Sequence, residues 1–137
     1  MKRINRRSDC PINFALETFG DRWSLLIIRD LLFFGKATYG QFLASEEGIA
    51  TNILADRLEK LEKADMVHKD GSTYSLTERG IDLLPVLLEV IVWSAKYDPK
   101  TAVPAGFVKD IRTRRDALIK EIRTGLKRHR FVAGRGD

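Results

Sequence analysis

Several residue types and patterns are scarce in this chain, and each scarcity excludes something. One cysteine among 137 residues cannot form an internal disulfide, so the fold must rest on an apolar core. No stretch reaches the roughly 18 uncharged apolar residues of a membrane span. The basic start is followed by acids and a glycine, which a signal-peptide core does not contain. With 44% hydrophobic and 31% charged residues, we expect one soluble domain in the cytoplasm.

Enzyme motifs are also missing. The sequence has no glycine-rich phosphate loop, no Cys-x-x-Cys or His-x-x-x-His spacing and no nucleophile elbow. Gly35-Lys36 lacks the upstream glycine of a P-loop, and the two histidines, His68 and His129, are too far apart in sequence to suggest a metal pair. We therefore expect neither catalysis, nor a metal, nor a cofactor.

The net charge of +5 favours a polyanionic partner, but it is unevenly distributed. Residues 1–9 carry a net +3 and residues 107–137 a net +6, whereas residues 10–106 carry a net −4. Solvated basic tails would give the same total, so an argument for nucleic-acid binding must rest on local pattern.

Helical spacing begins early in the chain. Residues 11–19 have apolar positions on one face, with Pro11 suited to a first helical turn and Gly20 ending it. Asp21 is placed to cap a helix over about 22–34, which Gly35 would end. Arg22 and Arg29 are expected to point outward, and the inward positions are Trp23, Leu26, Ile27, Leu31 and Phe34.

Two closely spaced helices follow. Thr38 can cap a short helix that runs through Ser45, and residues 46–48 form a tight turn. The next helix, about 50–63, places leucines 54, 58 and 61 on one side and polar residues on the other. A helix, a glycine-containing turn and a second helix form the DNA-binding helix-turn-helix motif.

A hairpin and further helices complete the prediction. β-Prone residues on both sides of Asp70-Gly71 predict a two-stranded wing. Residues 81–95 leave almost no polar face, so this long helix needs cover, best supplied by a second subunit. After a connector with Pro99 and Pro104, an apolar stripe through Ile111 and Leu118 predicts a basic terminal helix that packs on the partner.

The predicted fold class is mainly α with a small β-hairpin: a winged helix-turn-helix with N- and C-terminal dimerisation helices. We divide the chain into a basic arm at 1–9, the winged helix-turn-helix at 10–97, and a connector with a basic dimerisation helix at 98–137.

Three segments carry a family resemblance. CPINFALETFGDRWSLLIIRDLLFFGKATYGQFL, EGIATNILADRLEKLEKADMV and YSLTERGIDLLPVLLEVIVW resemble the HxlR-type (DUF24) branch of MarR-like regulators. The resemblance implies a homodimeric transcription regulator, and some members of the family sense electrophiles or oxidants through an N-terminal cysteine that Cys10 matches. The sequence departs from the family at Ala50, where a capping Ser is usual, and we expect Thr51 to take over that role. Its wing also lacks the usual Pro- and Arg-containing tip.

The helix-turn-helix suggests how a double-stranded DNA operator is bound. The N-terminal part of the second helix reaches base edges in the major groove, and here it presents Thr51, Asn52, Ala55 and Asp56. Asn52 is the candidate adenine reader, with Asp56 for cytosine and Ala55 for a thymine methyl. Phosphate or backbone contacts are expected from Thr38, Tyr39, Gln41, Arg57, Lys60, Lys69, Ser72 and Thr73. The polar face is alternatively an ordinary solvated surface, and the domain alternatively a protein- or RNA-interaction module.

Two further questions stay open at the level of sequence. Cys10 is a buried small hydrophobe, an inert surface residue, or a sensor activated by Arg6, Arg7 and the following helix start. The two tryptophans, Trp23 and Trp93, are expected in the core, with a ligand cavity between helices as the minority alternative. Any small-molecule or oxidant effector is unidentified.

Overall fold

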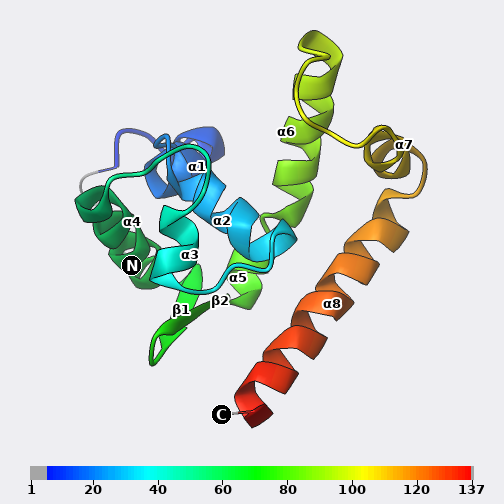
Figure 1. Cartoon of the computed structure of the whole chain (residues 1–137). Coiled ribbons are helices and arrows are strands. Elements are labelled where there is room, and N and C mark those ends of the chain that lie inside the picture. The colour runs from blue at the N-terminus through cyan, green and yellow to red at the C-terminus, as the bar shows by residue number, and fades with distance from the viewer. Residues whose placement is uncertain (1–5, 137) are drawn as a thin grey trace.

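A computed structural model describes residues 6–136, with side chains for residues 6–104 and 106–126. Helices and one antiparallel hairpin make up the described chain, which confirms the predicted fold class (Figure 1). The first part contains α1 (Pro11–Phe19), α2 (Ser24–Phe33), α3 (Tyr39–Leu43), α4 (Thr51–Lys63), β1 (Val67–Asp70) and β2 (Thr73–Leu76). The second part contains α5 (Glu78–Ile81), α6 (Leu84–Tyr97), α7 (Ala105–Thr113) and α8 (Arg115–Gly136).

Helix α2 begins at Ser24 with Trp23 as its N-cap, two residues later than predicted, and Asp21 caps the turn that leads into it. The Asp21 carboxylate accepts hydrogen bonds from the backbone N–H groups of Trp23 (2.8 Å) and Ser24 (2.9 Å), which satisfies donors of the first turn. The chain leaves α2 through Gly35, whose φ of 65° favours glycine. The expected inward position of Phe34 is wrong, because this side chain follows the last helical residue and is 59% exposed.

The helix-turn-helix forms as predicted, except at one cap. Thr38 and Gln41 make a reciprocal capping box at the start of α3. Helix α4 buries its three leucines at 54, 58 and 61 in the core. The N-cap of α4 is Ala50, with no side-chain hydrogen bond, so the expectation that Thr51 replaces the family's capping hydroxyl is wrong. Thr51 is already the first helical residue, and its side chain lies beyond the cap.

The wing is joined to the helix-turn-helix. Strands β1 and β2 pair from Val67 opposite Leu76 to Asp70 opposite Thr73. Gly71 at the turn has a φ of 61°. The backbone N–H of Tyr74 donates to the carbonyl of Ala37 at 2.7 Å, and an isolated bridge joins residues 38 and 73. Backbone contacts therefore hold the start of α3 against the wing.

The long helix predicted over residues 81–95 is two helices, which corrects the prediction. Thr77 caps the short α5, and α6 starts only after Asp82 and Leu83. Pro85 lies in the first turn of α6. Its ring lacks an N–H and would clash with the carbonyl four residues earlier, so an α-helix cannot continue unbroken through this position.

The terminal helix is also two helices, α7 and α8, separated at Arg114, which has non-helical dihedral angles. The apolar stripe of these helices is covered by residues of the same chain. Ile111 (1% exposed) and Leu118 (6%) belong to the same core cluster as the leucines of α4. The rings of Phe33 and Phe107 meet edge-on at 6.0 Å and join α2 to α7. The assignment of Ile111 and Leu118 to the partner subunit is therefore wrong.

Two apolar surfaces are left exposed instead. On α1, the apolar face is exposed at Ile12 (70%) and Leu16 (59%), and no residue of this helix is buried. On α6, Val86, Val90, Trp93 and Tyr97 are exposed. The expected core position of Trp93 is wrong, since 64% of it is exposed, while Trp23 is half-buried.

Candidate nucleic-acid interface

The first turns of α4 present a small polar surface. Thr51, Asn52 and Ala55 are exposed and Asp56 is half-buried. Leu54 and Leu58 on the opposite side are buried and fix the rotation of the helix about its axis. The structure therefore brings the sequence-predicted base-contacting residues together on one outer face.

Arg57 and Asp56 are held in ion pairs. The Arg57 guanidinium contacts both Asp56 and, at 3.1 Å, the Asp21 carboxylate that caps α2. Lys60 lies 3.2 Å from Asp56 and is 68% exposed. The hydrogen bond from Lys60 is the largest influence on the pKa of Asp56, which lies below its ordinary value. Lys60 is thus open to solvent, whereas Arg57 ties α4 to the start of α2.

Asp21 is a shared anchor for these two helices. Burial alone raises its pKa, but hydrogen bonds from the Ser24 hydroxyl, two backbone N–H groups and Arg57 outweigh this and lower it. The carboxylate thus stays ionised at neutral pH, so one side chain caps α2 and orients α4.

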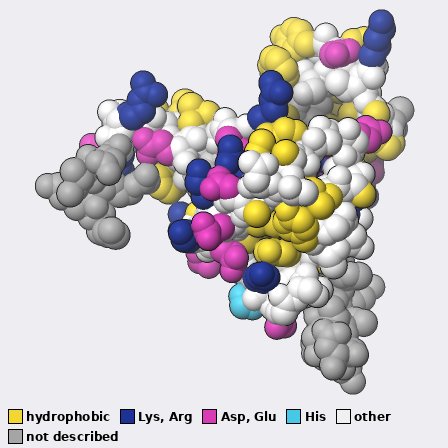
Figure 2. All heavy atoms as spheres, turned by 60° about the vertical axis from the view of Figure 1, so that its left-hand side comes forward, with side chains coloured by type: hydrophobic (Ala, Val, Ile, Leu, Met, Phe, Trp, Pro, Cys, Tyr) yellow, Lys and Arg dark blue, Asp and Glu magenta, His cyan; other side chains and the backbone are white. Residues whose placement is uncertain are grey.

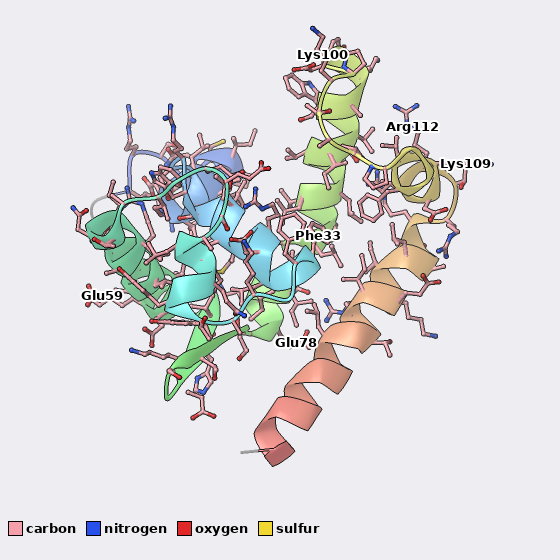
Figure 3. All side chains as sticks on the ribbon, viewed as in Figure 1. Phe33, Glu59, Glu78, Lys100, Lys109 and Arg112 are labelled. Carbon is pink, nitrogen blue, oxygen red and sulfur yellow. The ribbon has the colours of Figure 1, made fainter. Side chains whose placement is uncertain are left out.

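Acidic and basic side chains are interspersed around α4. Figure 2 brings this side of the molecule forward and shows Lys and Arg beside Asp and Glu, with no continuous basic surface in this view. Glu59 lies on the outer side of α4 (Figure 3), 3.7 Å from Lys63. Carboxylates near phosphates are unfavourable, so these pairs reduce the repulsion that α4 would otherwise meet.

The start of α3 uses its predicted phosphate-contacting residues internally as well. The side-chain amide oxygen of Gln41 accepts from the backbone N–H groups of Ala37 and Thr38, and the Thr38 hydroxyl accepts from the backbone N–H of Gln41. The Tyr39 hydroxyl donates to the carbonyl of Thr51 at 2.6 Å. These bonds fix α3 against α4, and they leave the Gln41 amide N–H₂ and the Thr38 hydroxyl hydrogen able to donate.

The wing residues are exposed. Lys69, Ser72 and Thr73 are all exposed to solvent, with Lys69 opposite Tyr74 and Thr73 opposite Asp70 in the hairpin. The Lys69 ammonium lies 5.7 Å from the centre of the Tyr74 ring, and the Thr73 hydroxyl donates to the carbonyl of Asp70. Both side chains remain within the reach of a ligand approaching the hairpin tip.

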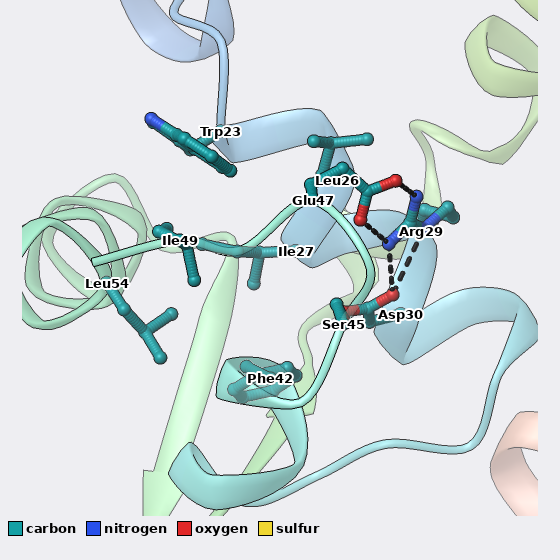
Figure 4. Close-up of a pocket in the computed structure, with 10 residues that line it drawn as sticks. All are labelled: Trp23, Leu26, Ile27, Arg29, Asp30, Phe42, Ser45, Glu47, Ile49 and Leu54. Carbon is teal, nitrogen blue, oxygen red and sulfur yellow. Dashed lines mark hydrogen bonds and ion pairs between the residues drawn. The ribbon is translucent and has the colours of Figure 1, made fainter. Parts of the chain in front are cut away.

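A buried polar network that the sequence did not predict holds the turn between α3 and α4 (Figure 4). Asp30, 3% exposed, accepts from the Arg29 guanidinium at 2.8 and 3.0 Å and from the Ser45 hydroxyl at 2.7 Å. Arg29 also binds Glu47 in the turn through two further hydrogen bonds, at 2.7 and 3.0 Å. These bonds lower the pKa of Glu47, and Lys36 donates to Ser45 at 2.7 Å.

This network corrects the expected outward position of Arg29, whose side chain is only 21% exposed. The signal in the sequence was an adjacent Arg-Asp pair inside an otherwise apolar helix. A charged pair in such a helix is buried only if it is matched by partners elsewhere.

Cys10 is exposed at the N-cap of α1. Its backbone N–H donates to the Ser8 hydroxyl, and its carbonyl accepts from the N–H of Phe14. Arg6 is paired with Asp9 at 3.2 Å. Of the three alternatives for this cysteine, the buried one is therefore wrong.

The arrangement of α2, α3 and α4 with an attached hairpin defines a winged helix that contains a helix-turn-helix. The HxlR-like helix-turn-helix family profile matches residues 18–102, and the chain belongs to this family. The curated relatives that it matches are HTH-type transcriptional regulators. No helix in the described part of the chain is long and apolar enough to cross a membrane.

Sequence and structure comparisons both find similar proteins among transcription regulators. An HTH-type transcriptional regulator of Synechocystis is 35% identical over 86 residues, which cover 58% of this chain and 63% of that protein. The chain thus spans less than two thirds of the first curated relatives it matches. PA1607, a candidate transcription factor, has a TM-score of 0.62 at 34% identity, covering 72% of each chain. Quinone-bound YodB from Bacillus subtilis has a TM-score of 0.57 at 30% identity, covering 64% of this chain and 99% of YodB.

Proposed function

We propose that the protein binds duplex DNA in a sequence-specific manner as a homodimer, with α4 in the major groove. One observation carries the proposal: the start of α4 presents an exposed polar face while the start of α3 and the wing are joined beside it. A helix fits the major groove, and the residues at its N-terminal end reach the base edges.

The proposed contacts divide into two kinds. Asn52 pairs bidentately with adenine, which discriminates against other bases by about 1–3 kcal/mol, and Ala55 makes an apolar contact with a thymine methyl. Lys60 and Lys69 contact phosphates, which adds affinity without specificity. Arg57 acts mainly by orienting α4 through Asp21, because both of its ion pairs lie within the chain.

The proposed dimer uses the exposed apolar faces of α1 and α6. Ile12 and Leu16 lie four residues apart on α1, and Val86, Val90, Trp93 and Tyr97 recur at three- and four-residue spacing on α6. Contiguous apolar surface of this kind is typical of interfaces. A two-fold dimer places two copies of α4 on successive major grooves, about 34 Å apart.

Binding of the reduced protein to duplex DNA from its own upstream region tests the proposal, with a shuffled duplex of the same composition and a salt series. Preference for the native duplex and a steep salt slope are expected. Asn52→Ala should reduce the preference, and Lys60→Ala should weaken both duplexes alike. Lys63→Ala, at the far end of α4, is the matched control. Equal effects of Asn52→Ala and Lys63→Ala would reject this orientation of α4, and no binding at low salt would favour the protein- or RNA-interaction module.

A redox or electrophile response through Cys10 is the second part of the proposal. The thiol is exposed at the start of α1, next to the apolar face proposed for dimerisation, so an adduct there reaches the interface. The similarity to quinone-bound YodB and to the redox regulator HypR supports this assignment. With no second cysteine in the chain, the product is an intersubunit disulfide or an adduct with a thiol or electrophile. Mild oxidation should change DNA binding in the native protein and leave Cys10→Ser unaffected; an identical response in both would exclude Cys10.

A further inference from the structure

A large hollow lies between the winged helix and the C-terminal helices. Its volume is about 1030 Å³, and its lining comes from α2, the hairpin, α6, α7 and α8. Most lining residues are apolar, among them Leu25, Phe33, Leu87, Phe107, Leu118 and Ile122. Figure 3 shows Phe33 at the end of α2, on the side that faces α7 and α8. The hollow is partly open to solvent, and exposed apolar surface of this extent commonly marks a binding site.

The volume suits a small organic molecule. Ligand pockets commonly enclose about 300–1000 Å³ and are lined mainly by apolar side chains with a few polar groups that fix orientation. The hollow is at the upper end of this range, and it is formed by elements far apart in the sequence.

Two cationic side chains lie together at one end of the lining. Arg29 and Lys36 both line the hollow, and they flank the ring of Phe34 at 5.1 and 5.9 Å. Their carboxylate neighbours Asp30 and Glu47 line the separate small pocket at the turn and not this hollow. Arg29 and Lys36 therefore border the hollow with these two carboxylates behind them, and Asp70 of the hairpin is the acidic residue in the lining.

Lys36 has N–H donors available for a ligand. Its ammonium carries three hydrogens and donates one hydrogen bond, to Ser45, among the described residues. Arg29 already makes four hydrogen bonds to Asp30 and Glu47. An anionic group at this end of the hollow would bind Lys36 first.

We propose that the hollow binds an amphipathic organic acid, with its apolar body between α6 and α8 and its carboxylate at Lys36. The occupied site connects to the helix-turn-helix, because Lys36 binds Ser45 and Ser45 binds the buried Asp30 that holds the turn. A carboxylate that draws Lys36 away from Ser45 loosens the turn before α4. This last step rests on the proposed function, whereas ligand binding itself does not.

Gly125 provides a way to fill the hollow without disturbing the core. It lines the hollow, and it follows Leu118 and Ile122 at seven- and three-residue spacing on the same face of α8. A Cβ built there meets no atom within 4 Å. Replacing a glycine inside a helix also favours the helix, so Gly125→Trp is expected to fold. Gly106→Trp is the matched control, because its Cβ is equally unobstructed and Gly106 is not part of the lining.

The test is calorimetric titration of the full-length protein, without DNA, with dodecanoate and with 1-dodecanol, both below their aggregation limits. Native protein and Gly106→Trp should bind dodecanoate at one site per chain, and Gly125→Trp should bind neither compound. Lys36→Met should bind dodecanoate about tenfold more weakly and dodecanol unchanged, since only the acid uses the charge. Thermal unfolding of each variant checks that it is folded.

Three results would overturn the proposal. Absence of dodecanoate binding to the native protein would do so, as would equal binding by Gly125→Trp and Gly106→Trp. A Gly125→Trp protein that loses dimerisation, with no dodecanoate bound by the native dimer, would show that a second copy fills the hollow instead. DNA affinity measured with saturating dodecanoate is a separate readout: a decrease supports the link through Lys36, and no change removes that link.

Discussion

Replacement of Asp30 by alanine tests the importance of the buried network at the turn. Asp30 accepts two hydrogen bonds from Arg29 and one from Ser45, and it is 3% exposed. Breaking a buried ion pair by removing one partner costs about 3–5 kcal/mol. Arg29 keeps its two bonds to Glu47 and some contact with water, so we expect a loss of about 3 kcal/mol, at the lower end.

The loss converts into a measurable change in melting temperature. Globular proteins unfold with about 2.1 cal/mol/K of entropy per residue, so a chain of 137 residues loses about 3–4 °C per kcal/mol. Asp30→Ala should therefore melt about 10 °C below the native protein at equal protein concentration. Asp30→Asn, which still accepts hydrogen bonds, should lose less.

Glu121→Ala is the control for this experiment. It removes a carboxylate that also pairs with an arginine, Arg114, but on the surface of α8, and it should leave the melting temperature unchanged. A drop below about 3 °C for Asp30→Ala, which is about 1 kcal/mol, would refute the assignment of the turn's stability to this network. A normal melting temperature with lost DNA binding would place Asp30 in recognition rather than in folding.

Other regions of the structure give three further expectations. Gly80→Ala should lose about 2 kcal/mol or more in denaturant unfolding, because the added Cβ would lie 2.2 Å from the carbonyl of Met66, whereas Gly106→Ala should lose nothing. The pKa of Asp21 is lower in the folded protein than its ordinary value of 3.8, so its stabilising contribution is present above that value and is lost as the pH falls through the folded pKa. Unfolding free energies from pH 6 to 2 should consequently decline less steeply in Asp21→Asn, and parallel curves would show that Asp21 contributes little. Trp93→Glu should give a monomer by light scattering with an unchanged far-ultraviolet spectrum; a dimer of full strength would exclude this face of α6.

Local patterns in the sequence were sufficient for the central part of the fold. Leu54, Leu58 and Leu61 recur at the spacing of one helical face, and Thr38 followed by Gln41 is a capping pattern, so α3 and α4 were predictable from neighbours along the chain. The Asp70-Gly71 pair specified the hairpin in the same way, because glycine readily takes the positive φ of the turn. The set of exposed residues on α4 follows directly from this periodicity.

Tertiary packing decided the features that local pattern cannot express. The apolar faces of α1, α6 and the terminal helices look alike in the sequence, yet Ile111 and Leu118 are buried and Ile12 and Trp93 are exposed. Periodicity shows that a face is apolar, and only the arrangement of helices determines what covers it. The same holds for charge, because Asp30 is buried and Arg29 half-buried only where Ser45 and Glu47 return to meet them. The sequence alone determined the helix-turn-helix and its hairpin, whereas the paired charges, the exposed apolar faces and the hollow beside α8 depend on contacts between residues distant in the chain.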